Sequence, residues 1–158
     1  TFVANNTTDR IVESVNLLLH VEQVKIEDLH HARMVLEAPI AKLAAKNRSE
    51  ENIAQLTCLI EKMEETQEQT QEFIDVDTEF HIEVARASGN TAFIVLIQAI
   101  IKILRSERTY AMDFQDQTES ALKHHKQILK MIIAQDEGKA EKAMQSHLDT
   151  VNEVIQSL

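Results

Sequence analysis

The sequence predicts an all-α fold, an antiparallel bundle of about six to seven helices. The chain has 158 residues but only 2 Gly and 1 Pro, too few for the many tight turns of an all-β fold. Its long segments are instead rich in Ala, Leu, Ile, Glu, Lys and Gln, and apolar residues recur every three or four positions. Because the breaks between these segments are short, the helices are expected to pack antiparallel.

The expected helices can be placed in order along the chain. Apolar spacing marks the first two, and Ser49 is a suitable N-cap for the third. Gly89 is a suitable residue to end the fourth, and the fifth is apolar nearly all round, which indicates a central position or an oligomer interface. Thr118 begins the sixth helix and Asp136 caps the seventh. The expected ranges are about 8–20, 26–46, 49–69, 71–88, 90–103, 118–135 and 136 to nearly the C-terminus, with a loop at 112–117.

Composition and charge exclude several functions. The formal net charge of −10 would repel phosphate backbones, so this chain is not expected to bind nucleic acid by itself. No apolar run approaches the roughly 20 residues that a membrane span needs, and no signal peptide is evident, so a cytoplasmic location is expected. The one cysteine, Cys58, excludes an internal disulfide, and its apolar neighbours predict a position in the core.

Asp77 and His81 are four residues apart and therefore share one face of the fourth helix. That face is otherwise apolar, and two ionisable groups on a core-facing stripe are costly unless something satisfies them. His125 falls into the apolar seam of the sixth helix, and His147 into that of the seventh, whereas His124 points about 100° away. Helical phase thus selects one carboxylate and three imidazoles from three helices.

This set of side chains suits a divalent transition metal ion. Three imidazoles and one carboxylate are typical ligands of zinc and nickel, which are the favoured ions, and manganese, iron and cobalt also suit them. Helical phase alone does not prove that the four side chains meet. A histidine on an apolar face is more often a satisfied core residue than a ligand, so at this point both interpretations stay open.

Two arginines are candidates for binding an anionic effector. Arg33 lies within the apolar stripe of the second helix, where a buried guanidinium needs an anionic partner. That partner is either Glu37, one turn further on, or a ligand carboxylate, and a snorkelling side chain is a third possibility. Arg105, at the end of the fifth helix, is a candidate for the same role, although a cation also favours a helix C-terminus.

Three stretches of the chain carry a family pattern. Residues 77–90 read D-T-E-F-H-I-E-V-A-R-A-S-G-N, which is similar to the signature D-x-x-F-H-x-x-I-A-x-A-S-G-N. Residues 125–148 follow H-x-x-I…D…A…M-x-x-H-L, and residues 33–45 follow R-x-x-L-E…L-A-A. Together they resemble the FCD domain, the C-terminal effector-binding domain of FadR-type regulators in the GntR superfamily of bacterial transcription factors. The resemblance covers about residues 26–155.

The resemblance implies a role for the polar cluster. In this family the matching aspartate and three histidines bind a divalent metal inside the bundle, which implies the same role for Asp77, His81, His125 and His147. The metal helps to hold a small carboxylate effector, to which Arg33 would pair. The expected protein is a homodimeric sensor, not an enzyme.

The resemblance also accounts for the N-terminus. Thr1-Phe2-Val3-Ala4 is similar to the end of the strand that closes a GntR winged helix. Residues 1–7 would then be the end of the wing and a linker, and residues 8–158 the helical effector-binding domain. Operator DNA would be bound only through the missing N-terminal domain, which fits the acidic charge of this chain.

Two alternatives compete with the sensor. The first is a helical metalloenzyme in which the His/Asp site activates water. Glu79 and Glu83 neighbour the Asp–His pair but lie off its face, so no general base is evident, and the E-x-x-H pairs of di-iron bundles are absent. The second is a binding module that has lost its metal and keeps the four side chains as a polar network.

Overall fold

The computed structural model describes residues 10, 13–15, 17, 22, 24–105 and 117–157. Within these residues every regular element is a helix, which confirms the all-α class. Of the predicted helix at 8–20 only residues 10, 13–15 and 17 are described, and of the predicted loop at 112–117 only residue 117 is. The helices are α2 (Ile26–Asn47), α3 (Glu50–Glu65), α4 (Thr70–Ala87), α5 (Thr91–Ile103), α7 (Gln117–Ile133) and α8 (Glu137–Gln156).

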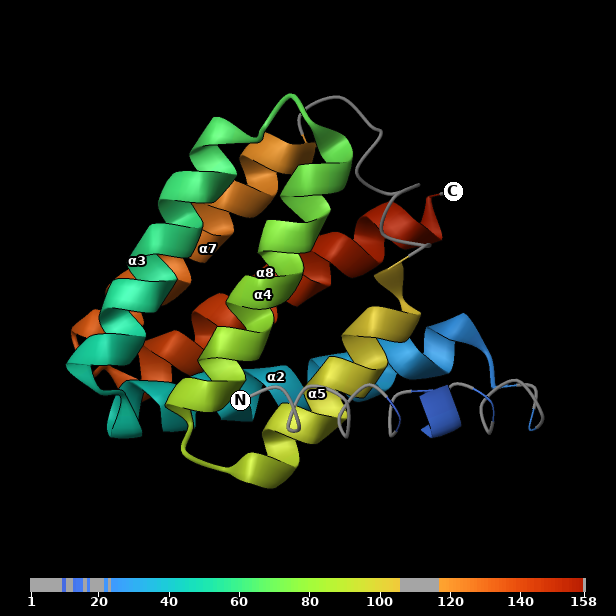
Figure 1. Cartoon of the computed structure of the whole chain (residues 1–158), viewed down its shortest axis with the longest axis horizontal. Coiled ribbons are helices and arrows are strands. Elements are labelled where there is room, and N and C mark those ends of the chain that lie inside the picture. Colours follow the sequence, from blue (N-terminus) through green and yellow to red (C-terminus); the bar gives the residue numbers. More distant parts are fainter. Residues whose placement is uncertain are drawn as a thin grey trace.

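The helices form an antiparallel bundle around α4. Helices α3 and α4 run side by side as a hairpin, and α7 and α8 lie behind them (Figure 1). Helix α2 packs mainly against α8 and also contacts α4, α5 and α7. Because α4 is enclosed by α2, α3 and α5, its side chains are buried on most of its circumference. Polar groups on the buried faces of α4, such as Asp77 and His81, therefore lie deep inside the molecule.

Capping explains several of the helix boundaries. Oγ of Ser49 accepts a hydrogen bond from the backbone N–H of Asn52 at 3.1 Å, while Oδ1 of Asn52 accepts from the Ser49 N–H at 3.0 Å, which is a capping box. Gly89 follows α4 with a φ of +74°, a left-handed conformation that favours glycine. Asp136 caps α8 by accepting from the N–H of Lys139 at 3.0 Å.

Helix α3 ends at Glu65, earlier than predicted. The segment from residue 64 to residue 72 contains no apolar side chain, so burial does not favour a longer helix there. The backbone N–H of Gln69 instead bonds the carbonyl of Thr66 at 2.8 Å, which turns the chain toward α4. Apolar periodicity could not locate this boundary, because the segment has no periodicity to interrupt.

The predicted core position of Cys58 was wrong, because its side chain is exposed. Leu56, Ile60 and Met63 are the buried residues of α3. Two residues of helix correspond to a rotation of about 200°, so Cys58 faces away from Leu56 and the core. Apolar neighbours in the sequence were a poor guide, because in a helix the adjacent residues point in different directions.

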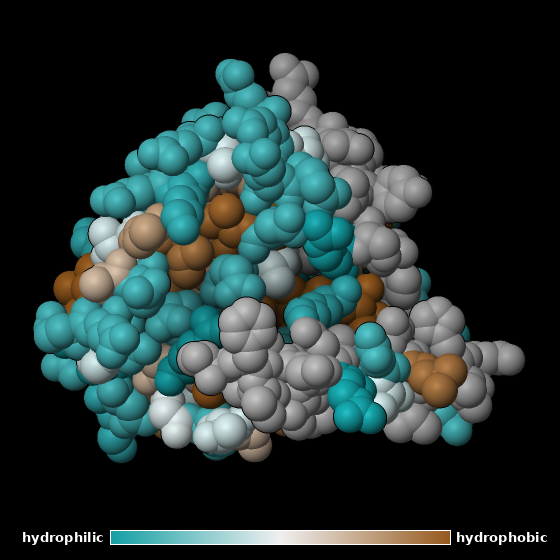
Figure 2. Space-filling view, viewed as in Figure 1, coloured by the Kyte–Doolittle hydropathy of each residue, from teal (hydrophilic) through white to brown (hydrophobic). Residues whose placement is uncertain are grey.

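The described surface is mainly hydrophilic, with hydrophobic patches between the polar side chains (Figure 2). Large apolar side chains that remain exposed include Leu17, Val35, Leu96 and Ile133. Within the part of the chain that the structure describes, no helix combines the length and the hydropathy that crossing a membrane requires.

Candidate metal centre

The four polar residues selected by helical phase meet inside the bundle. Asp77 and His81 come from α4, His125 from α7 and His147 from α8, and one ligand atom from each lies within 4.8 Å of the others. All four side chains are fully buried. The structure thus brings together the four residues that helical phase had selected, from α4 and from the consecutive helices α7 and α8.

The distances within this cluster are short. Nε2 of His125 lies 3.2 Å from Nε2 of His81 and 3.4 Å from Oδ1 of Asp77. Nε2 of His81 lies 4.0 Å from the same oxygen. The ring centroids of His125 and His147 are 4.5 Å apart. The ligands of a tetrahedral zinc ion lie about 3.4 Å from one another, so the cluster is close to the required spacing.

Burial keeps two of the imidazoles neutral. It lowers the pKa of His147 well below the ordinary value of 6.5, and the nearby His125 and His81 lower it further. Burial also lowers the pKa of His81, an effect that Glu37 opposes and Arg33 reinforces. A neutral imidazole has a lone pair on one nitrogen, which is the form that binds a metal ion.

Nε2 of His147 supports the fit of a cation to this site. The atom is buried and has no hydrogen-bond partner among the residues that the structure describes. A buried polar atom left without a partner costs roughly 1–3 kcal/mol. Coordination to a cation would satisfy it, and a set of three imidazoles and one carboxylate suits a divalent transition metal.

Arg33 and Glu37 adjoin the cluster from α2. Arg33 is the largest fully buried side chain, and its Nε donates to Glu37, as the sequence allowed. The other oxygen of Glu37 contacts Nδ1 of His81, and Nη2 of Arg33 lies 2.9 Å from Nε2 of His81. Burial would raise the pKa of Glu37, but Arg33 and His81 lower it to about 2, so this carboxylate is charged.

Sequence reasoning missed the contact between Glu37 and His81. The two residues are 44 positions apart, and helical phase relates only residues on the same helix. His30, also on α2, is a further buried histidine that the sequence analysis did not single out. The only sequence signal near this contact was the charged pair Arg33 and Glu37, four residues apart on an apolar stripe. That pair indicated that Glu37 could neutralise Arg33, but it gave no indication of a contact with His81.

Arg105 and His124 lie outside the cluster of four residues. Arg105 is exposed at the end of α5, and its Nη2 lies 2.6 Å from Oδ1 of Asp75. His124 is half-buried, and its Nε2 lies 3.4 Å from Oγ1 of Thr150. With His147 it lines a small cavity of about 20 Å³ between α7 and α8, which approaches the cluster from outside.

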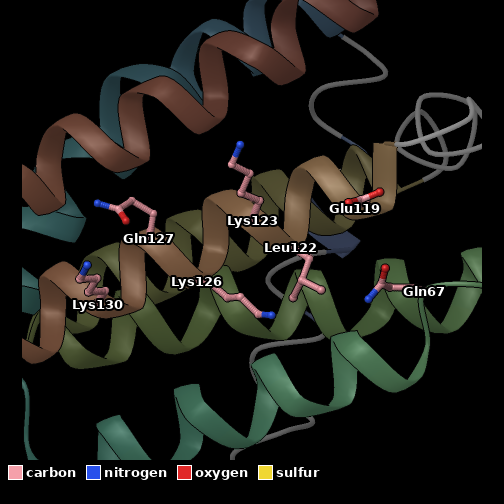
Figure 3. Close-up of a pocket in the computed structure, with 7 residues that line it drawn as sticks. All are labelled: Gln67, Glu119, Leu122, Lys123, Lys126, Gln127 and Lys130. Carbon is pink, nitrogen blue, oxygen red and sulfur yellow. The ribbon is translucent and has the colours of Figure 1, made fainter.

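A larger hollow of about 460 Å³ lies along the surface of α7, and none of the four cluster residues lines it. Figure 3 shows Lys123, Lys126 and Lys130 projecting from α7 around this hollow, with Gln67 on the neighbouring segment. Lys126 is already paired with Glu64 of α3. The hollow is a solvated surface feature, separate from the buried cluster.

Comparison with known proteins assigns the family. The model of the FCD domain matches residues 28–150. The chain belongs to the FCD domain family. This confirms the resemblance drawn from the three sequence patterns. The match also contains all four cluster residues and both residues of the Arg33–Glu37 pair.

Relatives of this FCD domain include named regulators. It is 28% identical over 129 residues to the HTH-type transcriptional repressor NanR of Salmonella arizonae and of Salmonella typhi, which covers 80% of the chain and 49% of each relative. The chain therefore spans about half the length of these curated relatives. Among solved structures it is similar to Streptococcus agalactiae GntR, with a TM-score of 0.71 and 24% identity over 92% of this chain and 60% of that one. It is also similar to E. coli McbR/YncC, with a TM-score of 0.73 and 17% identity over 83% and 67% of the two chains.

The buried imidazoles make the metal-free FCD domain sensitive to acid. In the folded domain the pKa values of His81 and His147 are lowered, whereas in the unfolded chain both have the ordinary histidine pKa of about 6.5. Below that pH the unfolded state binds more protons, so the free energy of unfolding should fall by up to about 1.4 kcal/mol per pH unit for each such group. Urea unfolding with a chelator present, at pH 7.5 and 5.5, measures this loss.

Protonation of Glu37 does not contribute to the loss of stability between pH 7.5 and 5.5. Its folded pKa of about 2 lies below its ordinary value of 4.5, so its contribution to stability is lost only at more acidic pH. A His147→Gln variant serves as the control, since it should lose less stability on acidification. Equal stability of the unmodified domain at pH 7.5 and 5.5 would contradict this prediction.

Proposed function

We propose that this FCD domain is the ligand-sensing and dimerisation domain of a GntR-family bacterial transcription regulator. It binds one divalent metal ion, with zinc or nickel favoured over manganese, iron or cobalt. The ligands are Asp77, His81, His125 and His147. The observation that carries the proposal is the convergence of these four buried side chains within 4.8 Å. The named relatives support a regulatory role, since NanR is a transcriptional repressor.

A small organic acid is the proposed effector. When bound, the metal ion supplies an electrophilic site for a carboxylate oxygen. Arg33 lies beside His81 and can bind a carboxylate with two parallel hydrogen bonds. Arg105 is the weaker candidate for such a contact, because it is exposed and paired with Asp75. Lactate, gluconate and citrate are suitable probes, because they are compact polar acids.

The effector would act on DNA through a winged-helix domain that precedes this chain. Residues 1–7 are proposed as the end of its wing and a linker. Binding of the acid would shift an equilibrium between arrangements of the bundle and so change the spacing of two winged helices on the operator. We propose a homodimer, in which the apolar side chains of α5 that remain partly exposed, such as Leu96, pack against a second copy.

Adding metal to the chelator-treated domain is expected to raise its melting temperature. An ion that binds only the folded state at 100 times its Kd adds about 2.7 kcal/mol, which corresponds to roughly 5–10 °C for a domain of this size. The small acids should give a further rise in the presence of metal and little or none in its absence. Thermal shift with and without each ion measures both effects. No metal in the purified protein, and no rebinding by the metal-free protein, would refute the proposal.

The metalloenzyme alternative has less support. Activation of water at the cluster would need a free general base nearby. Glu79 is exposed. Glu83 is buried but accepts hydrogen bonds from Asn52 at 2.8 Å and from Arg86 at 3.0 Å. Glu37, the carboxylate closest to His81 on α2, is held by Arg33 and His81.

A further inference from the structure

The two neighbours of His81 on α2 fix the protonation of its ring. The charged carboxylate of Glu37 can only accept a hydrogen bond, so Nδ1 of His81 must donate to it. The guanidinium of Arg33 can only donate, so Nε2 of His81, 2.9 Å from Nη2, must accept. Both contacts require the same neutral tautomer, with the proton on Nδ1 and the lone pair on Nε2. The lone pair therefore lies on the nitrogen that faces Asp77 and His125.

The guanidinium of Arg33 divides its donors among three directions. Nε donates to Glu37, and Nη2 donates to Nε2 of His81. Nη1 is buried and has no hydrogen-bond partner among the residues the structure covers. A fully buried donor of this kind points to a ligand, because burial without a partner is costly. Of the two terminal nitrogens, Nη1 thus has no partner among the described residues and Nη2 is hydrogen-bonded to the lone pair of His81.

We propose that Glu37 is the positioning residue of the metal site and that Arg33 competes with the cation for the lone pair on Nε2 of His81. Arg33 and a cation cannot share that lone pair, so Arg33 has to release His81 when the site is loaded. Its Nη1 and Nη2 are then both available to one carboxylate group, while Nε stays on Glu37. This inference rests on the proposed function, and it specifies an order in which the metal precedes the acid.

Substitutions of Glu37 and Arg33 should change the affinity for metal in opposite directions. Glu37→Gln is expected to weaken it by about 10- to 100-fold, the usual effect of losing the carboxylate that orients a ligating histidine. Arg33→Met is expected to strengthen it by at least about tenfold, because a competitor and a positive charge beside the site are both removed. Competition with a chromophoric zinc chelator measures both affinities. Arg33→Met should also abolish the response to small acids.

Glu83→Gln and Arg86→Met are the matched controls. Glu83 is a second buried glutamate and Arg86 is its partner, but both bond away from the cluster. Neither control should change the affinity for zinc. Nitrogen-15 NMR of the metal-free domain adds a second measurement, since the double variant Arg33→Met/Glu37→Gln, which lacks the carboxylate and the guanidinium, should allow the other tautomer of His81 to appear. A purely structural role for the two residues would not alter the tautomer.

Removing only one charge of a buried pair can prevent folding. The double variant Arg33→Met/Glu37→Gln avoids this, and it should bind zinc more tightly than Glu37→Gln alone. The inference would be overturned if Arg33→Met bound zinc no more tightly than the unmodified domain and the double variant bound it no more tightly than Glu37→Gln. The proposed metal site would still stand in that case. If the unmodified domain binds no metal, the proposed function fails as well.

Discussion

Alanine in place of His125 or His147 is expected to weaken metal binding by more than about 100-fold, because loss of a direct ligand exceeds the 10- to 100-fold effect of losing an outer contact. Each substitution would remove one of the four proposed metal ligands, and no other described imidazole belongs to the cluster. Chelator competition or calorimetry with zinc and nickel gives the affinities. The stabilisation by metal in thermal unfolding should disappear in parallel.

His124→Ala is the control for this pair. His124 adjoins His125 in the sequence, but it is half-buried and contacts Thr150, and its ring lies 5.6 Å from that of His147. Its removal should leave metal affinity unchanged. Equal losses from His124→Ala and His125→Ala would mean that the helical phase assignment is wrong.

Phe80→Ala is expected to destabilise the domain by about 3–5 kcal/mol and to weaken metal binding by about tenfold as well. Phe80 is fully buried on α4, and its ring centroid lies 4.6 Å from that of His125 and 6.1 Å from that of His81. The cavity left by the ring would remove the packing that holds these imidazoles. Urea unfolding gives the stability, and zinc affinity is measured at a temperature where the variant is folded.

Phe73→Ala separates packing of the site from packing of the core. Phe73 is also fully buried on α4, but it is two turns from Phe80 and stacks on none of the described imidazoles. Its loss should cost a similar free energy of unfolding without changing zinc affinity in the folded protein. If both variants weakened zinc binding equally, general loosening of the bundle would explain the result.

Helical periodicity was sufficient to predict the bundle and the four residues of the cluster. A helix places residues three and four apart on one face, so a polar residue in an apolar stripe is visible without a structure. Asp77 and His81 on α4, His125 on α7 and His147 on α8 were each identified in this way. The caps Ser49 and Asp136 were predictable for a related reason, since their hydrogen bonds are local.

Features that depend on packing between helices could not be predicted. The contact between Glu37 and His81 joins α2 to α4. No local rule relates two residues that are 44 positions apart on different helices. Cys58 is exposed because the opposite face of α3 packs against the bundle, whereas its apolar neighbours in the sequence had indicated burial. The convergence of the cluster is also of this kind, because phase specifies the face of each helix and not the depth at which faces meet.

The cluster draws its side chains from α4 and from the consecutive helices α7 and α8, which lie much later in the chain. An ion held there would act as a removable crosslink that closes a loop of roughly 60–70 residues between His81 and His147, and closing a long loop restricts the unfolded chain more than closing a short one. Helix α8 would then be held to the centre of the domain by a bond that forms when the ion is present and is lost when the ion is removed. The rigidity of the whole bundle would follow the availability of that ion.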